Sequence, residues 1–99
     1  MVEIKWTFQS VDDINSIADY IAKDSFKYAN LQIKRIFARA EILNKTPLSG
    51  RIVPELNNPK IRELILGNYR IIYKIINKKR IDILTVHHSA RQLINMSDL

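Results

Sequence analysis

Arginines in the second half of the chain are the residues best suited to chemistry, because tyrosines stand close to them. Arg70 lies directly after Tyr69 and three positions before Tyr73. Guanidinium groups bind phosphate through paired hydrogen bonds, and both guanidinium and phenol groups stack on nucleic-acid bases. The pattern therefore indicates a site that binds a phosphate or a target molecule. The candidate residues are Arg51, Arg62, Arg70, Tyr73 and Arg91.

The same arginines have acidic neighbours, so a structural interpretation stays open. Arg62 could pair with Glu63 or Glu55, and Arg70 could be a half-buried member of an ion pair. Alternatively, Arg62, Arg70 and Lys74 on neighbouring strands could form a positive patch on an open sheet face. Spacing alone favours the structural interpretation.

Two histidines near the end of the chain are the candidate acid or base groups. His87 and His88 are adjacent, so on a strand they face opposite sides and cannot bind one metal ion. The chain has no cysteine and no histidine pair at helical spacing, so we expect neither a metal nor another cofactor. One histidine could transfer protons near neutral pH, but a structural hydrogen bond is the commoner role at a strand end.

Positive charge is concentrated in the second part of the chain. Residues 1–44 contain six basic and six acidic side chains, whereas residues 45–99 contain ten basic and four acidic ones. The whole net charge of +6 therefore belongs to the second part. This asymmetry favours an anionic partner, which could be nucleic acid, an acidic protein segment or a phosphate-bearing substrate. A protein that is merely basic is the alternative.

Length and composition are those of one folded domain, expected to span residues 1–99. Hydrophobic residues make up 46% of the chain and charged residues 26%, as in soluble domains generally. No apolar run is long enough to cross a bilayer, and the first residues lack the apolar core of a signal peptide. We therefore expect a cytoplasmic protein with no membrane partner.

Hydrophobic periodicity predicts the elements that position these side chains. Period-two alternation predicts strands, and apolar residues three and four apart predict helices. Ser10 is expected to begin the first helix, with Asp12 and Asp13 in its first turn. The pair Gly67-Asn68 is expected to form a type II′ hairpin turn, and the segment 48–54 a loop or short edge strand. The expected strands span 2–8, 61–66, 69–76 and 81–87, and the expected helices 10–23 and 25–45.

These elements follow the order β-α-α-β-β-β. A helix followed closely by another helix implies an antiparallel helical hairpin. The predicted fold is therefore α+β, with the helical hairpin packed on one face of a largely antiparallel sheet.

Three motifs follow one another along the chain. They are Gly50-Arg51-Ile52-Val53-Pro54-Glu55, Tyr69-Arg70-Ile71-Ile72-Tyr73 and His88-Ser89-Ala90-Arg91. In this order they resemble the RelE/ParE superfamily of bacterial type II toxin–antitoxin toxins. The resemblance runs nearly end to end, and the family fold has the element order given above. It implies a toxin that is neutralised by a cognate antitoxin, whose C-terminal segment wraps over it. The basic second half leads us to expect that this segment is acidic as well as apolar.

The resemblance implies one of two activities. RelE-like members cleave mRNA in the ribosomal A site, whereas ParE-like members inhibit DNA gyrase and are not nucleases. Arg70 stands where RelE-like enzymes use an arginine at the cleaved phosphate, and His88 and Arg91 would complete such a catalytic set. However, Arg62-Glu63 replaces their basic pair on the preceding strand, and Ser89 stands where a second arginine is expected.

The depleted catalytic set favours a ParE-like toxin that binds gyrase and is not an enzyme. Two alternatives stay open. One is a ribosome-dependent mRNA endoribonuclease, and the other is a degenerate, non-toxic binding partner of the antitoxin.

Overall fold

The computed structural model describes residues 1–89 of the chain. Two helices and five strands follow one another in the predicted α+β order, with one short extra edge strand between the second helix and the main hairpin. The elements are β1 (Glu3–Trp6), α1 (Phe8–Ala22), α2 (Phe26–Glu41), the 3-10 helix η1 (Ile42–Asn44), β2 (Arg51–Ile52), β3 (Ile61–Leu66), β4 (Tyr69–Asn77) and β5 (Arg80–His88). No helix within residues 1–89 is long and apolar enough to cross a membrane.

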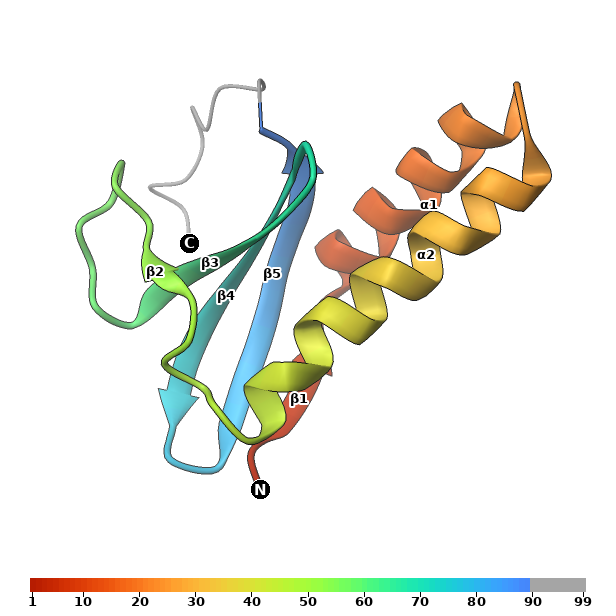
Figure 1. Ribbon diagram of the computed structural model, residues 1–99. Coiled ribbons are helices and arrows are strands. Elements are labelled where there is room, and N and C mark those ends of the chain that lie inside the picture. Colours follow the sequence, from red (N-terminus) through yellow and green to blue (C-terminus); the bar gives the residue numbers. More distant parts are fainter. Residues whose placement is uncertain (90–99) are drawn as a thin grey trace.

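The strands form one sheet, in the order β1-β5-β4-β3-β2. β1 pairs with β5 in parallel, and the other neighbouring strands are antiparallel. Figure 1 shows α1 and α2 side by side as a hairpin on one face of this sheet. The predicted turn between β3 and β4 is also present. Gly67 has a positive φ of 56°, as the first turn position of a type II′ hairpin requires.

The N-cap of the first helix lies three residues before the predicted cap, Ser10. Thr7 is the N-cap, and its hydroxyl accepts a hydrogen bond from the backbone N–H of Ser10. The same hydroxyl donates to the carbonyl of Ile83 on β5, so the chain leaves the sheet at Thr7. Phe8, expected to end the first strand, therefore starts α1. Asp12 and Asp13 lie beyond the first turn of the helix, and the prediction that they begin it was wrong.

The main core lies between the helical hairpin and the sheet. Its fully buried side chains include Ile36 and Leu43 from the helical segment, and Ile71, Tyr73 and Ile83 from the sheet. A second, smaller cluster lies on the opposite face of the sheet. It consists of Val53, Ile61 and Ile72, with Leu56 and Leu84 packed against them. The segment that follows β2 therefore covers part of the face that the helices leave open.

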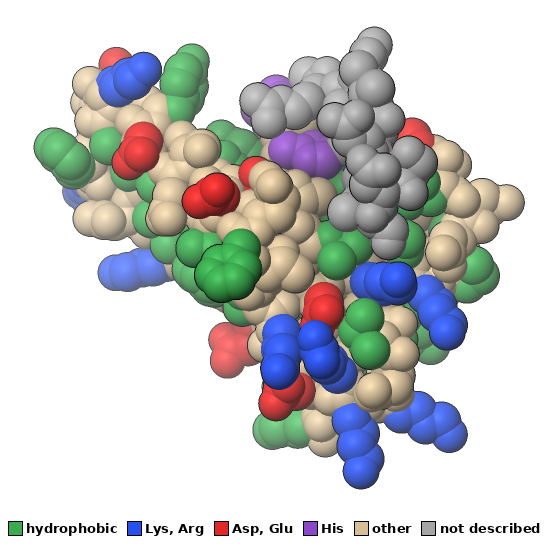
Figure 2. All heavy atoms as spheres, turned by 180° about the vertical axis from the view of Figure 1, so that it is seen from behind, with side chains coloured by type: hydrophobic (Ala, Val, Ile, Leu, Met, Phe, Trp, Pro, Cys, Tyr) green, Lys and Arg blue, Asp and Glu red, His purple; other side chains and the backbone are tan. Residues whose placement is uncertain are grey.

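Basic side chains are distributed unevenly over the surface. Figure 2 shows the molecule from behind, with several Lys and Arg side chains gathered over the lower half of the view. In Figure 1 the corresponding end holds the turn between β4 and β5 and the N-terminus. This location matches the excess of basic residues after position 44.

Candidate functional site

Arg70 lies on the face of the sheet opposite the helices, and its side chain is 9% exposed. Its Nε and Nη2 atoms donate to the two carboxylate oxygens of Glu63, at 2.8 and 2.7 Å. Its Nη1 and Nη2 atoms donate to the two oxygens of Glu55, at 2.7 and 3.0 Å. Two bidentate carboxylates thus occupy the guanidinium edges that a phosphate would need.

Strand register explains why these charges meet. Ile65 lies opposite Arg70 across the β3–β4 pair, so Glu63, two residues earlier on β3, points to the same face. Arg51 lies opposite Glu63 across the β2–β3 pair, and its Nη2 atom is 3.3 Å from a Glu63 oxygen. We call Arg51, Glu55, Glu63 and Arg70 the ion-pair cluster. Its two positive and two negative charges cancel, so the cluster carries no surplus positive charge.

Glu55 and Arg70 stabilise one another's charged states. The hydrogen bonds from Arg70 lower the pKa of Glu55 from the ordinary 4.5 to about 2, although desolvation acts in the opposite direction. The carboxylates in turn raise the pKa of Arg70, and the hydrogen bond to Glu55 is the largest cause. Arg70 therefore stays protonated at any physiological pH and cannot act as a general acid. Arg70 is therefore a member of an ion pair, as the structural interpretation of the sequence predicted.

Arg62 and Tyr73 lie opposite one another on the helix-covered face, away from Arg70. The expected patch of Arg62, Arg70 and Lys74 was therefore wrong, because Arg62 faces the other side of the sheet. The prediction that Arg62 could pair with Glu63 or Glu55 was also wrong. Its guanidinium instead donates to the backbone carbonyls of Pro59, at 2.9 Å, and Gly50, at 3.0 Å.

Tyr73 is fully buried and holds the loop that precedes β2. Its hydroxyl donates to the carbonyl of Pro47 at 2.8 Å and accepts the N–H of Gly50 at 3.0 Å. Burial raises the pKa of this phenol. A Cβ at Gly50 would lie 2.5 Å from the Tyr73 hydroxyl, so this close approach requires glycine. Tyr73 supports the fold here and does not face an open site.

His88 lies on the helix-covered face, opposite Tyr69, whereas Arg70 lies on the other face opposite His87. The rings of Tyr69 and His88 meet edge to face, with centroids 5.6 Å apart. The ribonuclease alternative takes His88 or His87 as its acid or base. The sheet separates the side chains of His88 and Arg70, whereas His87 lies on the same face as Arg70. Arg91, the third candidate of that set, lies outside the described residues.

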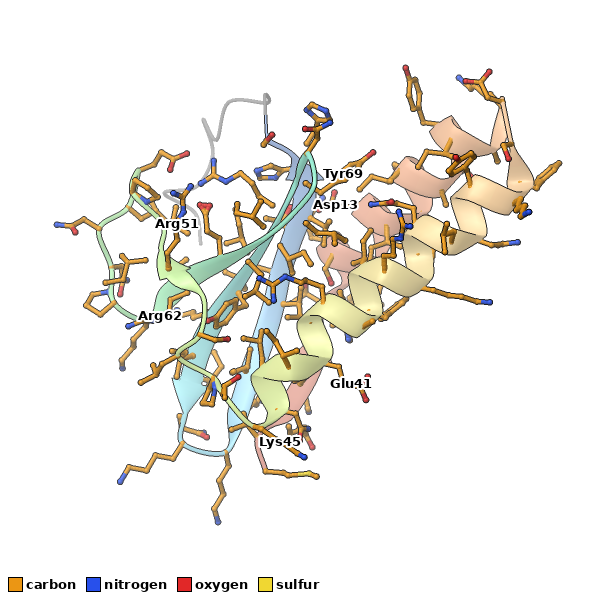
Figure 3. The ribbon with its side chains drawn as sticks, in the orientation of Figure 1. Asp13, Glu41, Lys45, Arg51, Arg62 and Tyr69 are labelled. Atoms are coloured by element: carbon orange, nitrogen blue, oxygen red, sulfur yellow. The ribbon has the colours of Figure 1, made fainter. Side chains whose placement is uncertain are left out.

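An open cleft of about 620 Å³, which the sequence did not predict, lies between α1 and the adjoining ends of β4 and β5. Figure 3 shows two of its lining residues, Asp13 and Tyr69, near each other at the top of the sheet. The Asp13 carboxylate accepts hydrogen bonds from the N–H of Val86, at 3.0 Å, and from the hydroxyl of Thr85. The lining residues are Asp13, Ser16, Ile17, Tyr20, Tyr69, Val86 and His88.

A second hollow, of about 390 Å³, lies between the edge strand β1 and α2. We call it the edge groove, and it is lined by Ile4, Trp6, Phe37, Ala40, Glu41 and Asn44. The rings of Trp6 and Phe37 meet edge to face at 4.6 Å, and Phe37 is 42% exposed. No short-range sequence signal reveals either hollow, because each depends on how a helix packs beside a distant strand.

Comparison with known proteins agrees with this architecture. Residues 4–93 match the family described as "ParE toxin of type II toxin-antitoxin system, parDE". The chain is 33% identical over 91 residues to the candidate toxin Y4kP of Sinorhizobium fredii, covering 90% of each protein. It is 26% identical over 91 residues to toxin RelE2 of Caulobacter vibrioides, covering 92% of this chain and 99% of that one.

The fold is also found in a solved structure described as a chromosomal ParDE TA system from P. aeruginosa. The TM-score is 0.73 at 23% identity, and the match covers 89% of this chain and 96% of that chain. The resemblance that the sequence motifs indicated is thereby confirmed. The chain belongs to the ParE toxin family of type II toxin–antitoxin systems.

Proposed function

We propose that this toxin inhibits growth by binding DNA gyrase, without catalysing a reaction, and that a cognate antitoxin neutralises it. The observation that carries the proposal is the saturation of Arg70 by Glu55 and Glu63. RNA cleavage requires donors aimed at the charge that develops on the phosphate, together with an acid and a base. In this chain the arginine at the expected position is already bound to two carboxylates.

Net charge supports the same proposal. A phosphate approaching the ion-pair cluster would meet two carboxylates as well as two guanidinium groups, so it would gain little electrostatic attraction. Displacing Glu63, which is 1% exposed, would also leave a buried carboxylate without its partner. Binding a protein target requires neither the attraction of a phosphate to the ion-pair cluster nor the displacement of Glu63. The family's ParE branch, in which gyrase is the target, is therefore the better match.

The choice between targets can be tested with two assays on the same purified protein. In the first, the toxin is titrated into a DNA gyrase supercoiling reaction. In the second, it is added to ribosomes that are translating a defined mRNA, and cleavage in the A site is mapped. We expect inhibition of supercoiling and intact mRNA. Cleavage of the mRNA with supercoiling unaffected would contradict the proposal.

The edge groove is the surface that we propose for the apolar side chains of the antitoxin. Its walls are the sheet edge at β1 and the side of α2, and Ile4, Trp6 and Phe37 provide its apolar part. An amphipathic segment could lay its apolar side chains there, as in other helix-in-groove complexes.

One substitution in the edge groove tests this contact. Phe37→Asp places a charge in the groove and should weaken antitoxin binding at least tenfold, measured by calorimetry. Phe26→Asp is the matched control, because Phe26 lies at the opposite end of α2 and is 79% exposed. The control should bind as the unmodified toxin does. Equal effects of the two variants would exclude the edge groove as the antitoxin site.

Salt provides an independent test of charge complementarity with the antitoxin. Charges that act at a distance speed encounter, and they are screened within about 8 Å at physiological ionic strength. We expect higher salt to slow association more than it speeds dissociation in stopped-flow measurements. Association rates that do not change with salt would rule out electrostatic steering.

A ribosome-dependent endoribonuclease is the second candidate. It is favoured by the similarity to a toxin named RelE2 and by the exposed position of His88 beside Tyr69. The mRNA assay above decides between the two candidates. The third possibility, that this chain is a degenerate, non-toxic binding partner of the antitoxin, needs a separate test. Expression of such a protein without the antitoxin would leave growth unchanged.

A further inference from the structure

Five lysines gather at one end of the sheet, around the turn between β4 and β5. The backbone contacts of this end bring them together. The Ile75 N–H donates to the carbonyl of Lys60, and the Glu3 N–H donates to the carbonyl of Lys79. The Val2 N–H donates to the carbonyl of Asn44, which places the next residue, Lys45, at the same end (Figure 3). We call Lys45, Lys60, Lys74, Lys78 and Lys79 the lysine end.

Two acidic residues at this end, Glu3 and Asp82, are matched by basic residues outside the lysine end. The Lys5 ammonium is 3.7 Å from Glu3, and Arg80 holds Asp82 with two hydrogen bonds of 2.8 and 3.1 Å. Within residues 1–89 no carboxylate forms an ion pair with any lysine of the lysine end. Four of the five lysines are exposed, and Lys74 is half-buried. The lysine end therefore presents an uncompensated positive charge.

We propose that the lysine end binds the phosphate backbone of double-stranded DNA. The hollow at this end is lined by Glu3, Asn77, Lys78, Lys79 and Arg80, all of them polar. Such a surface offers point charges on flexible stems, which suit phosphates spaced along a duplex. It differs from the ion-pair cluster, where the basic charge is cancelled. The proposal goes beyond the choice of gyrase or ribosome as the toxin's target.

An acidic protein segment is the competing anionic partner, and the surface fits it less well. Stable peptide binding uses apolar pockets or unpaired strand edges in addition to charge. The edge groove beside α2 is lined by Ile4, Trp6 and Phe37 among other residues, whereas no apolar residue lines the hollow at the lysine end. Single-stranded nucleic acid also fits less well, because the aromatic rings on which its bases would stack do not line the hollow at the lysine end. Charge without apolar or aromatic contacts is typical of sequence-independent binding to a duplex.

Fluorescence anisotropy with a labelled duplex of about 20 base pairs, of unrelated sequence, tests the proposal between 50 and 200 mM salt. The test variant is Lys60→Gln/Lys78→Gln/Lys79→Gln. The matched control is Lys23→Gln/Lys27→Gln/Lys34→Gln, which removes the same charge from exposed positions at the helical hairpin. Both variants must show the unfolding midpoint of the unmodified toxin.

We expect the test variant to lose at least tenfold in affinity and the control less than twofold. The slope of log affinity against log salt should fall by about 3 in the test variant, since each phosphate contact contributes about 0.9. Equal losses in the two variants would mean that net charge alone attracts DNA, and would overturn the proposal. So would the absence of binding at 50 mM salt. Displacement of the duplex by a lower concentration of a polyglutamate peptide would assign the lysine end to an acidic protein segment instead.

Discussion

The ion-pair cluster and the lysine end belong to the same sheet, and both concentrate basic side chains, yet their charges are used in opposite ways. In the cluster, Glu63 and Glu55 enclose Arg70 from two sides. At the lysine end, Glu3 and Asp82 are matched by Lys5 and Arg80, and the five lysines form no ion pair within residues 1–89. Whether a basic side chain can bind an external anion therefore depends on which acidic residue the strand register brings beside it. Its own type and its neighbours in sequence do not decide this.

The two regions should respond very differently to loss of positive charge, and Arg70→Ala should have the largest effect. Its removal leaves Glu63 buried without a cationic partner of comparable geometry. We expect the free energy of unfolding to fall by roughly 3–5 kcal/mol, as for other broken buried ion pairs. Denaturant unfolding measures this directly. A loss of about 0.5 kcal/mol or less, typical of surface sites, would contradict the burial of this residue.

Tyr73→Phe tests the second group of candidate residues, which lies on the helix-covered face. The substitution leaves the Gly50 N–H and the Pro47 carbonyl without the hydroxyl that they share. We expect a loss of about 1–3 kcal/mol in unfolding free energy, the cost of unsatisfied buried polar groups. Tyr20→Phe, at an exposed position, is the control and should change little. If both variants unfolded alike, Tyr73 would have no role in holding the loop.

The pH dependence of stability should report the ion-pair cluster. The pKa of Glu55 is about 2 in the folded protein and near 4.5 when the chain is unfolded. A lowered folded pKa stabilises the protein above pH 4.5, and this stabilisation is lost as the pH falls from 4.5 towards 2.

Because the Glu55 side chain is 43% exposed, solvent screening reduces its contribution to about 1 kcal/mol. Unfolding midpoints measured through this pH range should fall less steeply for Glu55→Gln than for the unmodified chain. Identical pH profiles for the two proteins would show that Glu55 contributes nothing to acid sensitivity.

The smallest effect on stability is expected at the lysine end. Lys60→Gln/Lys78→Gln/Lys79→Gln removes three charges that form no ion pair within residues 1–89. The unfolding free energy should stay within about 0.5 kcal/mol of the unmodified protein, as for surface substitutions in general. Thermal unfolding is sufficient to measure this. A clear loss of stability would show that these lysines hold the sheet end together, and would remove the contrast with the cluster.

Local patterns predicted the fold well. Period-two and helical periodicity located four strands and two helices, and Gly67-Asn68 located the hairpin turn. The start of α1 was missed because Thr7 and Ser10 are both suitable cap residues. A hydrogen bond from Thr7 to the distant β5 decides between them, and such a contact has no local signal.

Part of the site was within reach of the sequence. A two-residue turn at Gly67-Asn68 fixes the register of β3 and β4, which places Glu63 on the face of Arg70 and Arg62 on the other. The contact with Glu55 was not predictable in the same way, because it depends on how the segment after β2 folds over the open face. The cleft at Asp13 likewise requires α1 to be docked on β5.

Our main expectation is that Arg70 stabilises the fold and takes no direct part in the toxin's action. Arg70→Met/Glu63→Leu tests it, because well-packed apolar side chains of similar volume can replace a buried ion pair without loss of stability. Growth inhibition in the absence of antitoxin should be measured beside the unfolding free energy. We predict a folded double variant that inhibits growth as strongly as the unmodified toxin. A double variant that is equally stable but no longer inhibits growth would contradict the claim.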